Sequence, residues 1–192
     1  MSRPGSAALV AALALAACGS AQVPELLKSD LAGSPPGTTT LIVFSDYECG
    51  ACRSTHFELM KALQGAGQVR IVRHHVPLPS HPHAEIAARA AICVETLGAR
   101  ADRMDDELFA AGSARLDEAS CEEMAASQGV DRDRFNACLT SPQTSARLRR
   151  DMEAYLQAGG RGVPLLYVGH ERIEGAQDSE SLVSALRRAR GR

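Results

Sequence analysis

Two cysteines separated by two residues form the stretch of this chain that is best suited to chemistry. Cys49 and Cys52 follow a short apolar run, Leu41 to Phe44, that is typical of a buried strand, and apolar residues recur at helical spacing after Cys49. Free N–H groups and the helix dipole at such a junction stabilise a thiolate. Two cysteines at this spacing can also close a disulfide on the first helical turn. The pattern therefore predicts a redox site, with Cys49 as the attacking thiol and Cys52 sheltered.

Metal binding and a static disulfide are the alternatives for the same pair. Zinc takes four ligands and a second Cys-x-x-Cys is absent, so a metal site would have to add His56 and a distant histidine to the two cysteines. A static disulfide would contribute little stability, because the loop that it closes is short. We favour redox chemistry, and we expect no cofactor besides the redox-active disulfide itself.

Length, charge and cysteine content narrow the class of protein. The 192 residues suit one domain with an insertion, and the formal net charge of −2 gives no reason to expect binding to nucleic acid. Six cysteines are many for a cytosolic protein of this size, so they favour an oxidising compartment. Aromatic residues make up only 4% of the chain, so the core must rely mainly on aliphatic side chains.

The N-terminus has the pattern of an export signal over residues 1–17. Its apolar run is too short to span a bilayer, and it ends in Leu-Ala-Ala-Cys, which resembles the bacterial lipobox. The motif implies that Cys18 is lipidated and becomes the mature N-terminus, and Gly19 resembles the signal for sorting to an outer membrane. Ordinary cleavage after Ala21 is the alternative.

A tether is expected to follow, over residues 18–37. Its second half is rich in glycine and proline, which predicts a flexible chain, although the part from Pro24 to Leu31 could form a helical turn instead. We expect folded protein to begin near Thr38.

The rest of the chain changes from strand patterns to helical patterns and back. We expect strands at 41–44, 68–76, 163–168 and 171–174, a helix over about 50–65, a helical block over 83–159, and a last helix that begins at Asp178 or Ser179. This order predicts an α/β protein.

Four histidines near the end of the second strand resemble a metal cluster at first sight: His74, His75, His81 and His83. Strand alternation sends the first two to opposite faces of the sheet, and a proline separates the other two. We therefore expect solvated or helix-capping histidines here.

The order of these segments is similar to the DsbA-like branch of the thioredoxin superfamily. Four stretches carry the resemblance, which covers roughly 38–190: FSDYECGAC, RHHVPLPSHPHAEIAARAAIC, FNACL and GVPLLYV. It implies a thioredoxin fold with an inserted all-helical domain. The thioredoxin-like domain would comprise 38–82 and 160–192, and the helical insertion would comprise 83–159.

The resemblance also implies roles for single residues. Cys49 matches the nucleophilic cysteine and Cys52 the resolving one, while Val163 and Pro164 match a loop with a cis peptide bond that faces the two cysteines. The residue before the proline would pair its backbone with an extended substrate strand.

Some relatives carry a second, structural disulfide at the positions of Cys93 and Cys138, so the resemblance implies that these two are paired. Cys121 falls on an apolar helical face, and we expect it to be a small buried hydrophobic residue.

Two departures from the family pattern bear on redox strength. The residues between the cysteines are Gly50 and Ala51, where the most oxidising members have Pro-His, and Val43 stands where many relatives have a buried acid. These departures predict a moderate oxidant. On the known range of Cys-x-x-Cys thiols we expect a pKa of about 5.5 for Cys49. Proton linkage then gives a reduction potential of about −235 mV for the Cys49–Cys52 pair.

The sequence as a whole predicts an exported thiol:disulfide oxidoreductase of the periplasm or cell envelope, lipid-anchored at Cys18. Its expected partners are unfolded or partly folded exported proteins with free thiols, and a membrane redox partner that reoxidises Cys49 and Cys52. The alternatives are a reductase or isomerase of the same fold, a Cys/His copper or zinc chaperone, and a binding module with a vestigial site.

Overall fold

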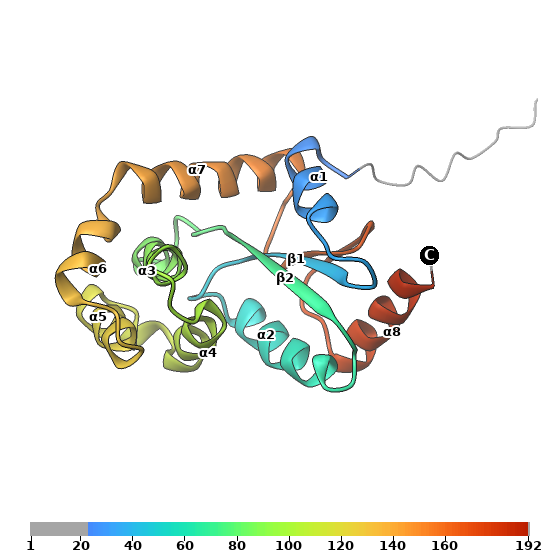
Figure 1. Ribbon diagram of the computed structural model, residues 1–192, viewed down its shortest axis with the longest axis horizontal. Helices are drawn as coiled ribbons and strands as arrows, with labels where there is room; N and C mark the ends of the chain where they lie inside the picture. The colour runs from blue at the N-terminus through green and yellow to red at the C-terminus, as the bar shows by residue number, and fades with distance from the viewer. Residues whose placement is uncertain (1–22, 192) are drawn as a thin grey trace, which may run out of the picture.

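A four-stranded sheet lies at the centre of the computed structural model, which describes residues 23–191 (Figure 1). Its strands are β1 (Thr39–Ser45), β2 (Val69–His75), β3 (Leu165–Val168) and β4 (Glu171–Glu174), in the order β2-β1-β3-β4. β1 pairs in parallel with β2 and antiparallel with β3, and β3 pairs antiparallel with β4. The parallel pair is joined by a helix, as parallel strands require.

Helices cover both faces of the sheet, so every residue of β1 is buried. On one face, α2 (Gly50–Leu63) and α8 (Ser179–Arg190) pack against alternate side chains of β1, including Leu41 and Val43. On the other face, α1 (Glu25–Ala32) and the end of α7 (Pro142–Gln157) pack against Ile42 and Phe44. The continuous apolar run of β1 is thus explained by burial on both sides.

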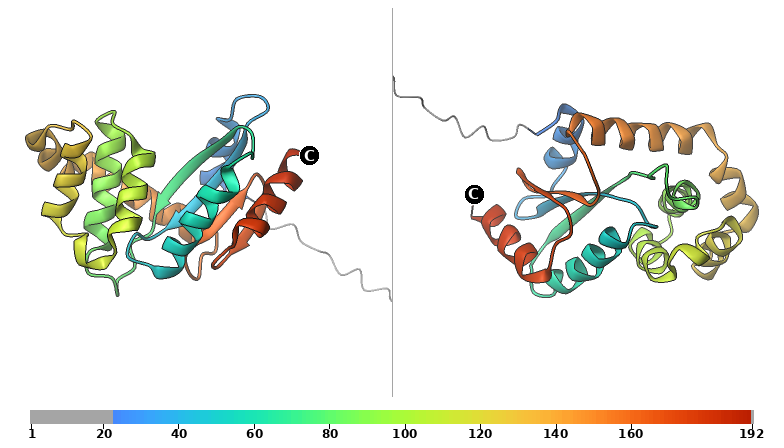
Figure 2. Two further views of the ribbon diagram at one scale, coloured as in Figure 1. Left: turned by 90° about the horizontal axis from the view of Figure 1, so that it is seen from below. Right: turned by 180° about the vertical axis from the view of Figure 1, so that it is seen from behind.

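The helical insertion lies beside one end of the sheet, between β2 and β3 in the chain (Figure 2). It contains α3 (Ala84–Thr96), α4 (Ala101–Ala111), the 3-10 turn η1 (Ser113–Arg115), α5 (Glu118–Ser127), α6 (Arg132–Leu139) and most of α7. Its core includes Met104, Leu108, Phe109, Leu116 and Phe135, each at most 1% exposed. The thioredoxin fold with an all-helical insertion, expected from the sequence, is confirmed.

The start of the folded part differs from the expectation of a tether up to Thr38. In the structure α1 packs on the sheet: Leu27 is fully buried, and Leu31 contacts the same cluster. These two leucines lie four residues apart, on one side of the helix, and they fill the face of the sheet that α7 leaves open. Of the predicted tether, residues 18–22 lie outside the described residues, as do the predicted signal at 1–17 and Cys18.

Cys93 in α3 and Cys138 in α6 are joined by a disulfide, with a sulfur–sulfur distance of 2.10 Å. The bond ties the first helix of the insertion to one that begins 48 positions later in the sequence, since α3 starts at Ala84 and α6 at Arg132. Cys121 is a free, buried thiol in α5 that donates to the Leu116 carbonyl at 3.7 Å. Between residues 23 and 191, no helix is long and apolar enough to cross a membrane.

Candidate active site

Cys49 lies at the junction of β1 and α2, where it is the N-cap residue of the helix. Its N–H donates to the Asp46 carbonyl at 3.2 Å, and its own carbonyl accepts from Arg53 N–H at 2.9 Å, so a turn and the first helical hydrogen bond fix its backbone. Cys52 follows in the first turn and is only 2% exposed, whereas Cys49 is partly exposed. The sequence predicted a sheltered Cys52 and an accessible Cys49, and the two residues have this exposure in the structure.

The loop before β3 supplies the opposite wall of the site. The peptide bond between Val163 and Pro164 is cis, and the Cys49 sulfur lies 3.8 Å from the Val163 carbonyl oxygen. The Pro164 carbonyl accepts from Gly175 N–H at 2.9 Å, which fastens this loop to the end of β4. The fold therefore brings together four residues that the sequence singled out, although Cys49 and Val163 are 114 positions apart.

The two thiols of the site differ strongly in acidity. The pKa of Cys49 is lowered to about 6, chiefly because the Cys52 side chain hydrogen-bonds to it, with help from the backbone N–H groups of Cys52 and Ala51. The same hydrogen bond, together with burial, raises the pKa of Cys52 far above that of an ordinary thiol. Near neutral pH the site therefore holds an accessible thiolate at Cys49 and a buried, protonated thiol at Cys52.

Asp46, in the loop between β1 and α2, is a buried acid of the site. Its side chain is 0% exposed. One carboxylate oxygen accepts from Glu48 N–H at 2.7 Å, and the other accepts from Leu78 N–H at 2.8 Å and from His81 Nδ1 at 2.8 Å. In the sequence, this arrangement is visible only as the Asp-x-x-Cys spacing. The turn before the helix brings Asp46 close to Cys49.

The expectation of solvated or capping histidines is wrong for His74 and His75, which are buried, whereas His81 is partly exposed. His74 is 9% exposed and lies between Asp30 and Asp151, at 2.9 and 3.0 Å. His75 is 3% exposed, and His81 is paired with Asp46. Their carboxylate partners come from α1, α7 and the β1–α2 loop, which are distant in sequence, so strand alternation alone could not show them. Only His83 is a capping residue, at the N-terminus of α3.

His56, a candidate ligand in the metal alternative, is buried in α2 and faces the helical insertion. Its Nε2 lies 2.7 Å from Asp106, and its Nδ1 lies 3.0 Å from the Arg73 guanidinium. Arg73 in turn contacts Asp105, which accepts from the Tyr47 hydroxyl. This network ties the turn before Cys49 to β2 and α4. Within residues 23–191, no group of three or more His, Cys, Asp or Glu side chains is arranged to hold a metal ion.

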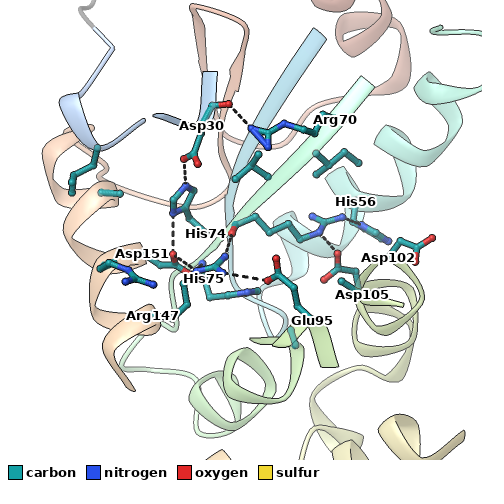
Figure 3. Close-up of a pocket in the computed structure, with 18 of the residues that line it drawn as sticks. Asp30, His56, Arg70, His74, His75, Glu95, Asp102, Asp105, Arg147 and Asp151 are labelled. Atoms are coloured by element: carbon teal, nitrogen blue, oxygen red, sulfur yellow. Dashed lines mark hydrogen bonds and ion pairs between the residues drawn. The ribbon is translucent and has the colours of Figure 1, made fainter. Parts of the chain in front are cut away.

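A cavity of about 590 Å³ lies at the outer edge of β2, away from the cysteines (Figure 3). Its lining combines charged and apolar side chains and includes His74, Arg147 and Asp151. On its α7 side, Arg147 donates to the Arg73 carbonyl at 3.0 Å and Asp151 accepts from His75 N–H at 3.1 Å. These two side chains occupy backbone groups that an edge strand would otherwise leave free, so they protect part of this edge from pairing with another strand.

The chain matches the family model described as Thioredoxin over residues 27–188 and belongs to that family. Among solved structures it is similar to a thioredoxin-like oxidoreductase from Silicibacter pomeroyi, with 24% identity, a TM-score of 0.69, and coverage of 80% of this chain and 87% of the other. It is also similar to the thiol-disulfide exchange protein α-DsbA2 from Wolbachia pipientis, with 20% identity, a TM-score of 0.65, and coverage of 81% and 84%. The catalytic domain of Proteus mirabilis ScsC has 19% identity, a TM-score of 0.66, and coverage of 89% and 100%.

One curated relative, the Na⁺/H⁺ antiporter NhaA of Herminiimonas arsenicoxydans, is 30% identical over 160 residues. The match takes in 82% of this chain but only 25% of the antiporter, so the chain spans about a quarter of the length of that relative. Family membership and the paired thiols together define the class of protein: a member of the thioredoxin family that carries a Cys-x-x-Cys pair at the junction of β1 and α2.

Proposed function

We propose that this protein introduces disulfides into exported proteins by thiol–disulfide exchange at Cys49 and Cys52. The observation that carries the proposal is the pairing of a partly exposed, acidic thiol at Cys49 with a buried, weakly acidic thiol at Cys52. Such an asymmetric pair has one sulfur that substrates can reach and one that only its neighbour can reach.

The oxidised protein would act in two exchange steps. A substrate thiolate attacks the Cys49 sulfur, the Cys49–Cys52 bond breaks, and its electron pair remains on the Cys52 sulfur, which takes up a proton. A second substrate thiolate then attacks the substrate sulfur of the mixed disulfide, and Cys49 leaves as a thiolate. The substrate has lost two electrons and the protein has gained them.

An extended substrate segment would be held by the backbone beside Val163. This residue is partly exposed, precedes β3, and directs its carbonyl to the Cys49 sulfur. Backbone hydrogen bonds recognise an unfolded chain without reading its side chains. We therefore propose unfolded or partly folded proteins with free thiols as substrates.

We place the protein in the periplasm or cell envelope. A disulfide between Cys93 and Cys138 suits an oxidising compartment, and one of the similar solved structures is a periplasmic thioredoxin-like protein from Salmonella enterica. Lipidation of Cys18 would hold the catalytic domain near a membrane redox partner that reoxidises the two cysteines. Mass spectrometry of the mature N-terminus tests this part: a diacylglyceryl mass on Cys18 supports it, and a free N-terminus at Gln22 contradicts it.

The direction of exchange follows from the acidity of Cys49. A pKa of about 6 lies about one unit below that of thioredoxin. At pH 7, proton linkage then stabilises the reduced form and raises the reduction potential by about 20 mV, to about −250 mV. The value is close to the sequence expectation and favours an oxidant of moderate strength.

The experiment compares both directions under identical conditions. Oxidised protein is mixed with a reduced dithiol peptide, and reduced protein is mixed with insulin, with Cys121→Ala as the control because that thiol is buried outside the site. We expect the peptide to be oxidised at least tenfold faster than insulin is reduced. Faster insulin reduction would show that the protein is a reductase. Activity in neither assay would favour the alternative of a binding module with a vestigial site.

A further inference from the structure

The buried carboxylate of Asp46 belongs to the turn that precedes Cys49, and its charge opposes the thiolate. Its backbone carbonyl accepts from Cys49 N–H, and its side chain is 0% exposed. The electrostatic effect of this carboxylate raises the pKa of both Cys49 and Cys52. An uncompensated negative charge here would therefore weaken the acidity on which exchange through Cys49 depends.

His81 is placed to compensate that charge. Its Nδ1 lies 2.8 Å from the Asp46 carboxylate, while its side chain is 25% exposed and can exchange protons with solvent. The hydrogen bond to Asp46 raises the pKa of His81, and the Cys49 thiolate acts in the same direction. The loop that carries His81 is anchored to the same acid through Leu78 N–H.

Glu48 is a further charged group that acts on this pair. Glu48 also favours the charged form of His81, and its own carboxylate accepts from His83 N–H at 2.9 Å. The groups that act on His81 are thus Asp46, Glu48 and Cys49, from the β1–α2 loop and the N-terminus of α2, and all three favour a positive charge on the imidazole.

We propose that His81, held by Asp46, is a positioning residue for disulfide exchange: its positive charge neutralises the buried Asp46 carboxylate and so protects the Cys49 thiolate from like-charge repulsion. The inference rests on the proposed function, because it assigns to the pair a role at the same two sulfurs. It adds no chemical step. It explains why the site tolerates a buried carboxylate next to a nucleophile that must be anionic.

The test measures the rate at which iodoacetamide alkylates Cys49 as a function of pH, in the reduced protein. His81→Gln removes the positive charge, and we expect the midpoint of the profile to rise by about half a pH unit or more. His81→Lys keeps a positive charge and should stay near the wild-type midpoint. The double variant Asp46→Asn with His81→Gln removes both charges and should restore it.

His170→Gln is the matched control, because that histidine is exposed in the turn between β3 and β4. A midpoint for His81→Gln that equals the wild-type value, or one that rises equally in His81→Lys, would overturn the inference. The His81→Lys arm keeps the test decisive even if Asp46→Asn fails to fold. Alkylation needs no substrate protein, so its result is independent of the oxidase assay. The role of His81 can fail while the oxidase function holds, and the oxidase function can fail while the role of His81 holds.

Discussion

At the scale of single residues, one hydrogen bond sets the two sulfurs of the site apart. The Cys52 thiol donates to the Cys49 thiolate, which stabilises the charged form of Cys49 and the neutral form of Cys52. Backbone N–H groups at the start of α2 add to the effect, as the strand–helix junction in the sequence indicated. The main cause, however, is the hydrogen bond from the neighbouring thiol of Cys52, which the pattern of the sequence alone does not show.

The first prediction concerns the roles of the two thiols. In Cys52→Ser the Cys49 thiolate can attack a disulfide of a substrate protein, and the mixed disulfide that forms should accumulate because Cys52 is no longer there to release it. Cys49→Ser should accumulate none, since Cys52 is only 2% exposed. Non-reducing gels followed by mass spectrometry read out both variants. Mixed disulfides of equal yield through Cys52 in the Cys49→Ser variant would reverse the assignment.

The second prediction tests the origin of the acidity of Cys49. Cys52→Ala removes the hydrogen-bond donor that is the largest cause of the lowered pKa. The pKa of Cys49 should rise from about 6 towards the ordinary value for cysteine, about 8.5, but remain below it because the helix N–H groups are still present. Thiolate absorbance measured against pH gives the value, with Cys121→Ala as control. A pKa that stays at about 6 would assign the effect to the backbone instead.

At the scale of secondary structure, patterns in the sequence predicted most elements but not their long-range partners. Apolar spacing predicted two strands bounded by proline and glycine and the helices after Cys49 and Asp178. The structure has β3, β4, α2 and α8 close to these places. The α1 helix lies within residues 18–37, where the glycine and proline content predicted a tether, with a helical turn from Pro24 to Leu31 as the alternative. Its burial depends on packing against side chains of α7 and β1, among them Tyr155 and Phe44, which local pattern cannot show.

The third prediction concerns the disulfide that joins α3 and α6. It spans 45 positions, and the chain-entropy model gives a stabilisation of up to about 4 kcal/mol for a loop of this length. Replacing Cys93 and Cys138 together by alanine should lower the free energy of unfolding in urea by about 2–4 kcal/mol. The Cys49 thiolate titration should be unchanged, because the disulfide lies within the insertion. Unaltered stability would show that helix packing alone fixes α3 against α6.

The fourth prediction concerns His74, which links α1, β2 and α7 through Asp30 and Asp151 (Figure 3). Burial lowers its pKa, but the hydrogen bonds to these two carboxylates outweigh that effect, and the net pKa is raised. A raised folded-state pKa means that protonated His74 stabilises the fold. This contribution is complete below the unfolded pKa of about 6.5 and is lost as pH rises through the folded value.

His74→Gln should therefore reduce the free energy of unfolding most at about pH 5–6, and the difference from the wild type should shrink at higher pH. Urea unfolding at a series of pH values measures this, with His170→Gln as the control. A difference that does not vary with pH would mean that the imidazole acts through packing rather than through its charge.

At the scale of the whole molecule, the redox site lies where the thioredoxin part meets the helical insertion. Tyr47 and Cys52 belong to the same buried cluster as Phe109 of α4, so the insertion forms part of the wall around the site. The order of motifs in the sequence predicted this architecture and the meeting of Cys49 with Val163. It could not predict the Asp46–His81 pair or the Tyr47–Asp105 contact, because both depend on how loops and helices pack in three dimensions.

A redox titration of Cys49 and Cys52 tests the central claim most directly. The protein is equilibrated in glutathione buffers of known potential, quenched with acid, alkylated, and analysed by mass spectrometry of the peptide that contains both cysteines. We expect one reversible two-electron transition at about −250 mV, absent from Cys49→Ser. Cysteines that remain free thiols at every potential between about −320 and −120 mV would contradict a redox-active pair.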